Sequence, residues 1–514
     1  MVDRENVHNT RTQLLTPQPL EEVTKESEHG YGSFVAYCFS VNYILGVGVL
    51  GVPNAFYQGG IVVGPLALLA VTIFAMMSAT WILETMARAQ AIYSNTTGTN
   101  ERDASEQLVD SEQDPTDNSN LMVFHITHRK FEMNELCKMF LGTPGKLLYE
   151  LCVCLYLYGA LWSYGSVFAE SMALFIPLPI KGWYTCDVAL DHSSTCNNLY
   201  MIYIGIFALM VVPLTCLNLT EQKSLQVVLT IFRYVALGLM IVITAVNIGA
   251  DPYSRFSEQP HITMEPTGPY KSSFNLATFL GLSILFPTCI YSQILHHSIP
   301  GLSQPARNKK RLNTIYGSTF ITTLLFYVIL GIVLVIYYGP NIRSTCSLNF
   351  GFWRAGVPFG GPIPGWATAI SFLIVLFPAI DVISAFPLNG ITLGNNLHTG
   401  FFASRPNLMN KRWIQIIFRM VAAVPPLIGA LFVRDLSKIL SYVGLVGFII
   451  TFVFPPILNI VSRRLCDREF GCWRTHWTVP VVTSTPMCIV VAILGFASVL
   501  FCVAMNIYVA VVTK

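Results

Sequence analysis

The chain has 514 residues, of which 53% are hydrophobic and 11% are charged. Soluble domains carry roughly 25% charged residues, so this composition excludes an ordinary soluble protein and indicates an integral membrane protein. The formal net charge is +3 and the basic residues are scattered, so no nucleic-acid partner is expected.

The first part of the chain, residues 1–32, is polar and lacks the apolar core and cleavage site of a signal peptide. We therefore expect a cytoplasmic tail at 1–32 and a membrane domain at 33–512. A helix needs about 20 apolar residues to cross a bilayer. Eleven such runs lie near residues 34–57, 61–87, 147–176, 199–217, 223–247, 273–297, 314–339, 366–390, 413–433, 437–460 and 486–511. The expected fold is an all-α polytopic protein with eleven transmembrane helices in the lipid bilayer.

Basic residues in the loops set the orientation of the chain. Lysine and arginine near the ends of spans are retained in the cytoplasm. The main clusters are "RNKKR" at 307–311, Lys411–Arg412 and Arg463–Arg464, and all three share a side with the N-terminus. We therefore expect a cytoplasmic N-terminus and a C-terminus on the opposite side. The plasma membrane and a lysosomal or vacuolar membrane both remain open as the compartment.

The segment at residues 91–146 joins the second and third spans on the cytoplasmic side. Its first part, "NTTGTNERDASEQLVDSEQDPTDNSN", is acidic, poor in apolar residues and typical of a solvated, disordered segment. Its last part includes "FEMNELCKMFLGTPGKLL", which we expect to lie as a helix on the membrane surface. A cytoplasmic protein partner bound by the tail or by this loop is an alternative to a plain linker, and the composition favours the linker.

Two cysteines, Cys186 and Cys196, fall in the loop between the third and fourth spans, on the side away from the cytoplasm. That environment is oxidising, so we expect a disulfide between them. No Cys or His set has the spacing of a zinc site, and the adjacent His296 and His297 do not share a helix face. No metal and no organic cofactor are therefore expected.

The first span contains "NYILGVGVLGVPNAF" at residues 42–56, with glycines and a proline in its middle. Inside a helix, glycine costs about 1 kcal/mol and proline about 3 kcal/mol. A helix broken at membrane depth is tolerated only where the break is buried in protein or lines an aqueous cavity. Secondary transporters place substrate sites at such breaks. The sixth span has a related segment, "GLSILFPTCIYSQIL", around Pro287, although close packing at small residues is an alternative explanation.

These motifs resemble those of a known family. The first span follows the pattern G-x-G-x-L-x-x-P as Gly46, Gly48, Leu50 and Pro53, and a late segment reads "SYVGLVGFIITFVFPPIL". With the eleven apolar runs, these features are similar to the amino acid/auxin permease family of the amino acid, polyamine and organocation superfamily. The stretches "ILETMARAQA" and "GITLGNNL" resemble its transmembrane protein 104 subgroup.

The resemblance implies a LeuT-like fold of two five-helix inverted repeats plus one helix, with helices 1 and 6 broken. It implies secondary active transport of amino acids by alternating access, coupled to protons or sodium. The substrate would contact unwound segments, carried over here as residues 46–50 and 285–290. The candidate substrate-binding residues are Asn42, Gly46, Val47, Gly48, Leu50, Ser283, Leu285, Phe286 and Thr288. For Asn42 and Ser283, a hydrogen bond between helices is the alternative role.

Two ionisable residues lie deep in spans, where a charge is costly and needs a partner or a water path. Asp381 in the eighth span and Arg233 in the fifth lie at the same depth, about 14 Å from the cytoplasmic edge at 1.5 Å per residue. We hypothesise that Asp381 carries a coupled proton with Arg233 as its counter-ion, because arginine does not deprotonate in proteins. A purely structural ion pair is the alternative.

Other polar groups in the spans are less specific. Ser384 is a further candidate ion-coupling residue, as a hydroxyl group in the eighth span. Sodium-dependent carriers of the resembled fold use uncharged hydroxyl ligands there, so the charged Asp381 favours a proton over sodium. Glu84 and Arg88, spaced i, i+4 at the inner end of the second span, are expected to pair at the membrane interface.

Two other classes of function compete with transport. A transceptor would bind an amino acid and signal through the tail or the acidic loop without net flux, and the long cytoplasmic loop permits this. A membrane enzyme would need clustered catalytic groups, and the sequence contains no HExxH motif, no GxSxG motif and no carboxylate pair at catalytic spacing. We therefore expect a transporter of amino acids and not an enzyme.

Overall fold

The computed structural model describes residues 30–97, 124–126, 131–179, 182–216, 223–250, 280–357, 361–402 and 411–512. Residues 1–29 and most of the acidic loop lie outside these ranges, so the expectations of a linker or a protein partner there stay predictions. The described chain is mainly helical, with one two-stranded antiparallel sheet in which Leu178 pairs with Tyr184.

The first half of the described chain contains six helices and the small sheet. These are α3 (Ser33–Ile44), α4 (Gly48–Gly59), α5 (Val63–Thr97), α7 (Met133–Phe175), β1 (Leu178–Pro179), β2 (Trp183–Tyr184), α8 (Ser194–Cys216) and α9 (Lys223–Ala250).

The second half contains α10 (Leu282–Ser292), α11 (Ile299–Ser303), α12 (Leu312–Tyr338), α13 (Gly365–Phe402), α15 (Arg412–Phe432), α16 (Leu436–Phe448), α17 (Phe454–Phe470) and α18 (Thr485–Val512). Short 3-10 helices η1 (His296–Ser298), η2 (Lys309–Arg311), η3 (Gly339–Asn341) and η4 (Cys346–Phe352) lie between them. A π-helical turn, η5 (Ile449–Val453), joins α16 to α17.

Within the described residues, nine helices are long and apolar enough to cross a membrane, or ten if α3 and α4 form one bent span. The predicted class, an all-α polytopic membrane protein, is confirmed. Helix α10 has only 11 residues, and the chain just before residue 280 lies outside the described part. The count of eleven spans and the two inverted repeats therefore stay predictions.

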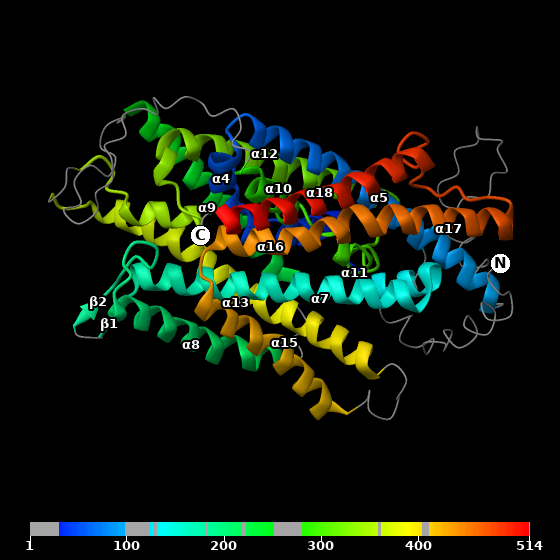
Figure 1. Ribbon diagram of the computed structural model, residues 1–514, viewed down its shortest axis with the longest axis horizontal. Coiled ribbons are helices and arrows are strands. Elements are labelled where there is room, and N and C mark those ends of the chain that lie inside the picture. The colour runs from blue at the N-terminus through cyan, green and yellow to red at the C-terminus, as the bar shows by residue number, and fades with distance from the viewer. Residues whose placement is uncertain are drawn as a thin grey trace.

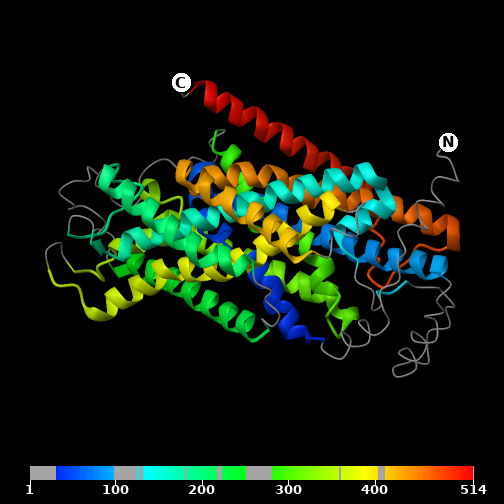
Figure 2. The same ribbon diagram turned by 90° about the horizontal axis from the view of Figure 1, so that it is seen from below.

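The long helices run side by side along one direction, which is horizontal in Figure 1. Helix α7 lies inside the bundle, with 72% of its most apolar window buried, whereas α18 lies at the edge with 22% buried (Figure 2). Large apolar side chains stay exposed on outward faces, including Leu209, Ile493 and Phe496. This pattern fits a bilayer, because lipid tails solvate apolar side chains as well as a protein core does.

Small residues set the closest helix contacts, as membrane bundles require. Gly444 of α16 lies against the backbone of Pro287 in α10, where a β-carbon would overlap the Pro287 carbonyl group. Gly159 of α7 faces the side chain of Val443 in the same way. Helix α10 is thereby held closely against α16, and it packs against α4 as well.

Helix α7 begins at Met133 and bends at Gly142, whose φ of 73° favours glycine. A capping box closes its N-terminus, because Glu132 and Glu135 each accept a hydrogen bond from the other's backbone N–H. The sequence predicted a helix on the membrane surface in this region. The chain is helical from Met133 to the bend at Gly142 and helical again from the bend to Phe175. The position of the first segment on the membrane surface stays a prediction.

Two spans are interrupted. In the first, residues 45–47 are not helical, and α4 is bent by 51° from α3. In the sixth, α10 ends at Ser292, residues 293–295 are not helical, and the chain resumes as η1 and α11. The break that the sequence predicted near Gly46 and Val47 is therefore present.

The predicted extent of both breaks is wrong. Gly48 and Leu50 are helical, and Gly48 serves packing, because a β-carbon there would lie 3.0 Å from the Tyr291 ring. Residues 285–290 are helical too, since α10 runs through Pro287. A proline removes one backbone N–H, and neighbouring helices can compensate without unwinding.

The observed break in the sixth span carries no glycine or proline. Gln293 is fully buried, and its side chain satisfies polar groups on two neighbouring helices. Its Nε2 donates to Thr72 Oγ1 of α5 at 3.1 Å, and its Oε1 accepts from Thr323 Oγ1 of α12 at 3.1 Å. Buried partners of this kind let the backbone leave the helical conformation inside a membrane.

The contact at Gly444 generates a stability prediction. Gly444→Ala places a methyl group against the Pro287 carbonyl, so α10 and α16 must separate. Overpacking of this kind costs about 1–3 kcal/mol, and we expect a lower melting temperature in detergent. Gly205→Ala on α8 is the matched control, because nothing lies within 4 Å of its added methyl group. Equal melting temperatures for the two variants would show that the contact is not tight.

Candidate functional site

A cavity of about 420 Å³ lies among α3, α7, α9, η1, α11 and α13. One end is formed by Asn42, Gly46 and Arg233 at the first break, and the other reaches Glu132 and Met133, where α7 begins. None of the described residues of α4 or η4 lines it. The other lining residues are Tyr31, Phe39, Tyr43, Asn134, Tyr149, Val153, Tyr164, His297, Ser298, Gly301, Leu302, Pro305, Ser384, Ala385, Leu388, Asn389, Thr392 and Asn396.

A buried ion pair lies at the end of the cavity near the break. Arg233 of α9 donates from Nε to Asp381 Oδ1 of α13 at 2.8 Å and from Nη2 to the same oxygen at 2.5 Å. The two side chains are 4% and 6% exposed. The structure therefore brings together the two charges that the sequence placed at one depth. Charge-assisted bonds between buried partners are among the stronger polar contacts in proteins.

The same guanidinium group holds the end of α3. Its Nη1 donates to the backbone carbonyl of Asn42 at 2.6 Å and to the Asn42 side-chain Oδ1 at 3.1 Å. Thr230 also donates to this Oδ1, at 3.0 Å, and Tyr327 donates to the Ile44 carbonyl at 2.9 Å. The last carbonyls of a helix lack intrahelical partners and carry partial negative charge. Arg233 and Tyr327 satisfy two of these carbonyls here.

The structure separates the predicted substrate-binding residues into two groups. Asn42 and Gly46 line the cavity, and Ser384, a predicted ion-coupling residue, lines it too. The Ser384 hydroxyl donates to the Asp381 backbone carbonyl at 2.8 Å, so it is already engaged on its own helix. Asn42 also has the alternative role of a hydrogen bond between helices, because its side chain bonds to α9.

The other predicted substrate-binding residues do not line the cavity; these are Val47, Gly48, Leu50, Ser283, Leu285, Phe286 and Thr288. Those of α10 face its packing partners: the Leu285 side chain lies against Gly59 of α4, and the Phe286 ring lies 6.2 Å from Phe501 of α18. The sequence predicted these α10 residues as substrate-binding because it placed the break of the helix around Pro287. With the break at residues 293–295, it is η1 and α11 that reach the cavity.

Several cavity residues were missed from the sequence. Tyr164 of α7 and Asn389 of α13 both line it, and Asn389 Nδ2 donates to the Tyr164 hydroxyl at 3.0 Å. His297 lines it from η1. A tyrosine or an asparagine inside an apolar span is a weak signal. The spacing of the adjacent histidines argues against a metal site, and it does not indicate that one of them lines a cavity.

On the side of the break away from the start of α7, η4 packs across α4, α7 and α13. Phe350 of η4 is fully buried. Thr345, just before η4, donates to Glu170 Oε2 of α7 at 3.0 Å, and Asn54 Nδ2 of α4 donates to the Ile342 carbonyl at 3.3 Å. These contacts cover the break on the side where α7 ends.

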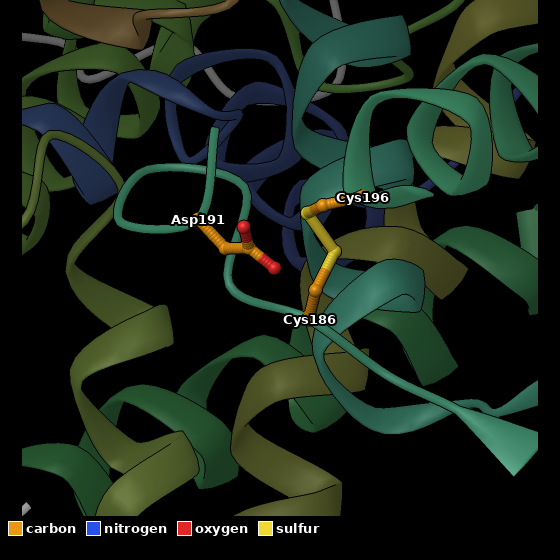
Figure 3. A group of neighbouring side chains, drawn as sticks. All are labelled: Cys186, Asp191 and Cys196. Carbon is orange, nitrogen blue, oxygen red and sulfur yellow. A yellow bond between two sulfur atoms is a disulfide. The ribbon is translucent and has the colours of Figure 1, made fainter. Parts of the chain in front are cut away.

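Cys186 and Cys196 form the predicted disulfide, in the segment that follows β2 (Figure 3). With Asp191 they are the one described group of three His, Cys, Asp or Glu residues whose ligand atoms lie close enough for a metal ion. The two sulfurs are bonded to each other and are therefore not thiolate ligands. Asp191 accepts from the Tyr184 hydroxyl at 2.5 Å and from the Ser193 N–H at 2.8 Å, which lowers its pKa. These bonds brace the loop.

Glu84 and Arg88 pair at 3.5 Å, as the sequence predicted, and their position at the membrane interface stays a prediction. Both side chains are fully buried against α17 and the segment after it. Glu84 accepts from Asn459 Nδ2 at 2.5 Å and from Thr483 Oγ1 at 3.0 Å. Buried charges need such partners, and these bonds tie α5 to α17.

Comparison with known proteins shows the family of the chain. A model of the family described as "Transmembrane amino acid transporter protein" matches residues 31–505. Transmembrane protein 104 of Homo sapiens is 28% identical over 484 residues, covering 88% of this chain and 91% of that protein. The homologues of Drosophila melanogaster and Dictyostelium discoideum are each 26% identical, covering 87% and 86% of this chain and 91% and 90% of those proteins.

The buried ion pair generates a stability prediction. Asp381→Leu leaves Arg233 buried without its counter-ion, and breaking a buried pair in this way costs about 3–5 kcal/mol. The double variant Arg233→Met/Asp381→Leu removes both charges and is expected to recover much of that loss. Melting temperatures of the purified variants in detergent measure both effects. The single variant Arg233→Met completes the comparison. A double variant whose melting temperature falls by the sum of the two single-variant losses would contradict the pairing.

The disulfide between Cys186 and Cys196 generates a second stability prediction. Removing a native disulfide that closes a short loop costs about 2–4 kcal/mol, so Cys186→Ser/Cys196→Ser is expected to melt at a lower temperature. Added reductant is expected to lower the wild-type melting temperature and to leave that of the variant unchanged. Cys472→Ser, at a partly exposed cysteine outside the disulfide, is the control. A wild-type protein that does not respond to reductant would contradict the bond.

Proposed function

Because the chain belongs to the transmembrane amino acid transporter family, we propose that it carries amino acids across a membrane by alternating access around the cavity at the first break. The observation that carries the proposal is the position of Arg233, which lines this cavity, binds the end of the broken helix and pairs with Asp381. A transporter needs a substrate site and a coupling group that can affect each other. Here Arg233 connects the two.

The break supplies the groups that an amino acid requires. Residues 45–47 are unwound, Gly46 lines the cavity, and α4 starts at Gly48. The N-terminus of a helix carries partial positive charge and attracts a carboxylate, and unwound carbonyls attract an ammonium group. Asn389 and Tyr164 offer further polar groups beside the break, because the Tyr164 hydroxyl would lie 4.0 Å from a β-carbon at Gly46. The predicted binding residues that do not line the cavity are set aside in this proposal, which keeps Asn42 and Gly46.

Proton coupling follows from the bonds of Arg233. Arginine stays charged, so the titrating member of the pair is Asp381. Protonation of Asp381 weakens its attraction to the guanidinium group, which also holds the Asn42 carbonyl. One proton therefore changes how firmly α13 is tied to α9 and to the end of α3. Sodium is the less favoured coupling ion, because the guanidinium group already supplies positive charge at this position.

The conformation corresponds to one access state. The cavity extends toward the start of α7, while η4 covers the break on the other side. With the N-terminus in the cytoplasm, as the basic loops suggest, this is an inward-facing state. The plasma membrane and a lysosomal or vacuolar membrane both remain candidate compartments, and tagged protein followed by cell fractionation would decide between them.

Uptake into proteoliposomes tests the function. A panel of labelled amino acids is supplied with and without an imposed pH gradient, in sodium-free and in sodium-containing buffer. We expect accumulation that follows the pH gradient and does not need sodium. Asp381→Asn keeps the shape of the side chain but cannot titrate, so gradient-driven accumulation should fall to the level of empty vesicles. Asp467→Asn, at an exposed position of α17, is the control.

Accumulation driven by sodium and insensitive to pH would contradict proton coupling. Saturable binding of an amino acid without flux under either gradient would contradict transport and favour a transceptor.

A further inference from the structure

One histidine of the cavity has no assigned role. His297 follows the second break, as the middle residue of η1, and its side chain lines the cavity. Its ring lies between two tyrosine rings, with Tyr43 of α3 at 6.4 Å and Tyr156 of α7 at 5.3 Å between centroids. Its Nδ1 is buried and has no hydrogen-bond partner in the described part of the chain. The imidazole is therefore held in place by aromatic rings and not by polar bonds.

The neighbouring histidine shows the contrast. His296 is fully buried, and its Nε2 lies 2.9 Å from the carbonyl oxygen of Ala75 in α5. A carbonyl can only accept, so this nitrogen carries the hydrogen atom. His296 thus connects η1 to α5 and does not line the cavity. Of the two adjacent histidines, one anchors the segment and the other faces the space that a ligand would occupy.

No carboxylate of the described residues lies within ion-pair distance of His297. On α7 the nearby titratable groups are Tyr149 and Tyr156, and Glu150 of that helix pairs with Lys146 at 3.2 Å. On α3 the facing group is Tyr43. Tyrosines are neutral at physiological pH. None of these groups can balance a positive charge on the imidazole.

The remaining neighbours of η1 offer no counter-ion either. Neither α11 nor η5 contains a titratable residue, and on η1 itself the neighbour is His296. On α5 the charged Glu84 and Arg88 bind each other and α17. A proton on His297 therefore needs a negative charge that comes from outside the protein.

The other charges of the cavity are already balanced. Arg233 is paired with Asp381, and Glu132 caps the N-terminus of α7, where the helix dipole favours a negative charge. A zwitterionic amino acid adds no net charge to this cavity. A second carboxylate on the ligand adds one negative charge, and in a cavity at membrane depth an uncompensated charge is costly. A proton on His297 compensates it.

We propose that His297 makes the cavity selective for acidic amino acids, by binding a proton together with the side-chain carboxylate of glutamate or aspartate. The inference rests on the amino acid transport proposed above and names the substrate class of that cavity. The amino and carboxylate groups of the ligand occupy the first break, and its side chain extends toward η1. The protonated imidazole then donates a hydrogen bond to the second carboxylate, and it keeps its packing against Tyr43 and Tyr156.

Equilibrium binding to the purified protein in detergent tests this inference independently of flux. Labelled glutamate and glutamine are compared at pH 5.5 and pH 7.5. In this proposal the imidazole takes up a proton together with the ligand carboxylate, so glutamate binding consumes one proton and strengthens as the pH falls. We therefore expect the wild-type dissociation constant for glutamate to be about tenfold lower at pH 5.5. Glutamine binding should change much less between the two pH values.

Three variants separate the role of His297 from a general effect on folding. His297→Gln keeps a hydrogen-bond donor without a titrating group, so glutamate should bind more weakly and equally at both pH values. Glutamine should still bind to this variant, which shows that the cavity is intact. His297→Phe keeps the aromatic packing and should lose glutamate in the same way. His476→Gln, at an exposed position outside the cavity, should behave as the wild type.

Two results would overturn the inference. One is a pH response of glutamate binding in His297→Gln equal to that of the wild type. The other is a wild-type protein that binds neutral amino acids and not glutamate at either pH. If acidic amino acids bind in a His297-dependent manner and no flux follows, the transport proposal fails while the assignment of His297 stands.

Discussion

The arginine at the first break is the interaction on which the rest of the site depends. A helix that stops inside a membrane leaves carbonyl groups that lipid cannot satisfy, at a cost of several kcal/mol each. Arg233 donates to one of these carbonyls, and Asp381 balances the charge that this solution introduces. The broken helix, the buried arginine and the buried aspartate therefore require one another. Removing any one of them leaves a polar or charged group of the others without its partner.

This arrangement joins the cavity to the bundle. The guanidinium group connects α3, α9 and α13. We therefore propose that its bonds respond both to a ligand at the break and to the charge on Asp381. The second break reaches the same cavity through η1, where His296 is tied to α5 and His297 faces the cavity. Close contacts at Gly444 and Gly159 hold the surrounding helices together, because apolar burial gives little driving force inside lipid.

The sequence predicted the features that depend on local composition. The membrane class, the broken first span and the two cysteines of the disulfide follow from apolar runs, from glycines at mid-span and from a loop in an oxidising compartment. The sequence also predicted that Arg233 and Asp381 lie at the same depth, because a charge inside an apolar run is rare and easily located. The second break was misplaced, since Pro287 stays helical and Gln293 is recognisable only through its partners Thr72 and Thr323. Tyr164 and Asn389 likewise become site residues only through packing.

The most direct test of the central claim is the protonation state of Asp381 itself, measured by infrared difference spectroscopy on the purified protein as the pH is lowered. A protonated carboxyl group absorbs as a C=O stretch that an ionised carboxylate lacks. The account predicts such a band in the wild type, its absence in Asp381→Asn and its shift when an amino acid binds. The same band in both proteins, unaffected by any amino acid, would contradict the coupling of the ion pair to the cavity.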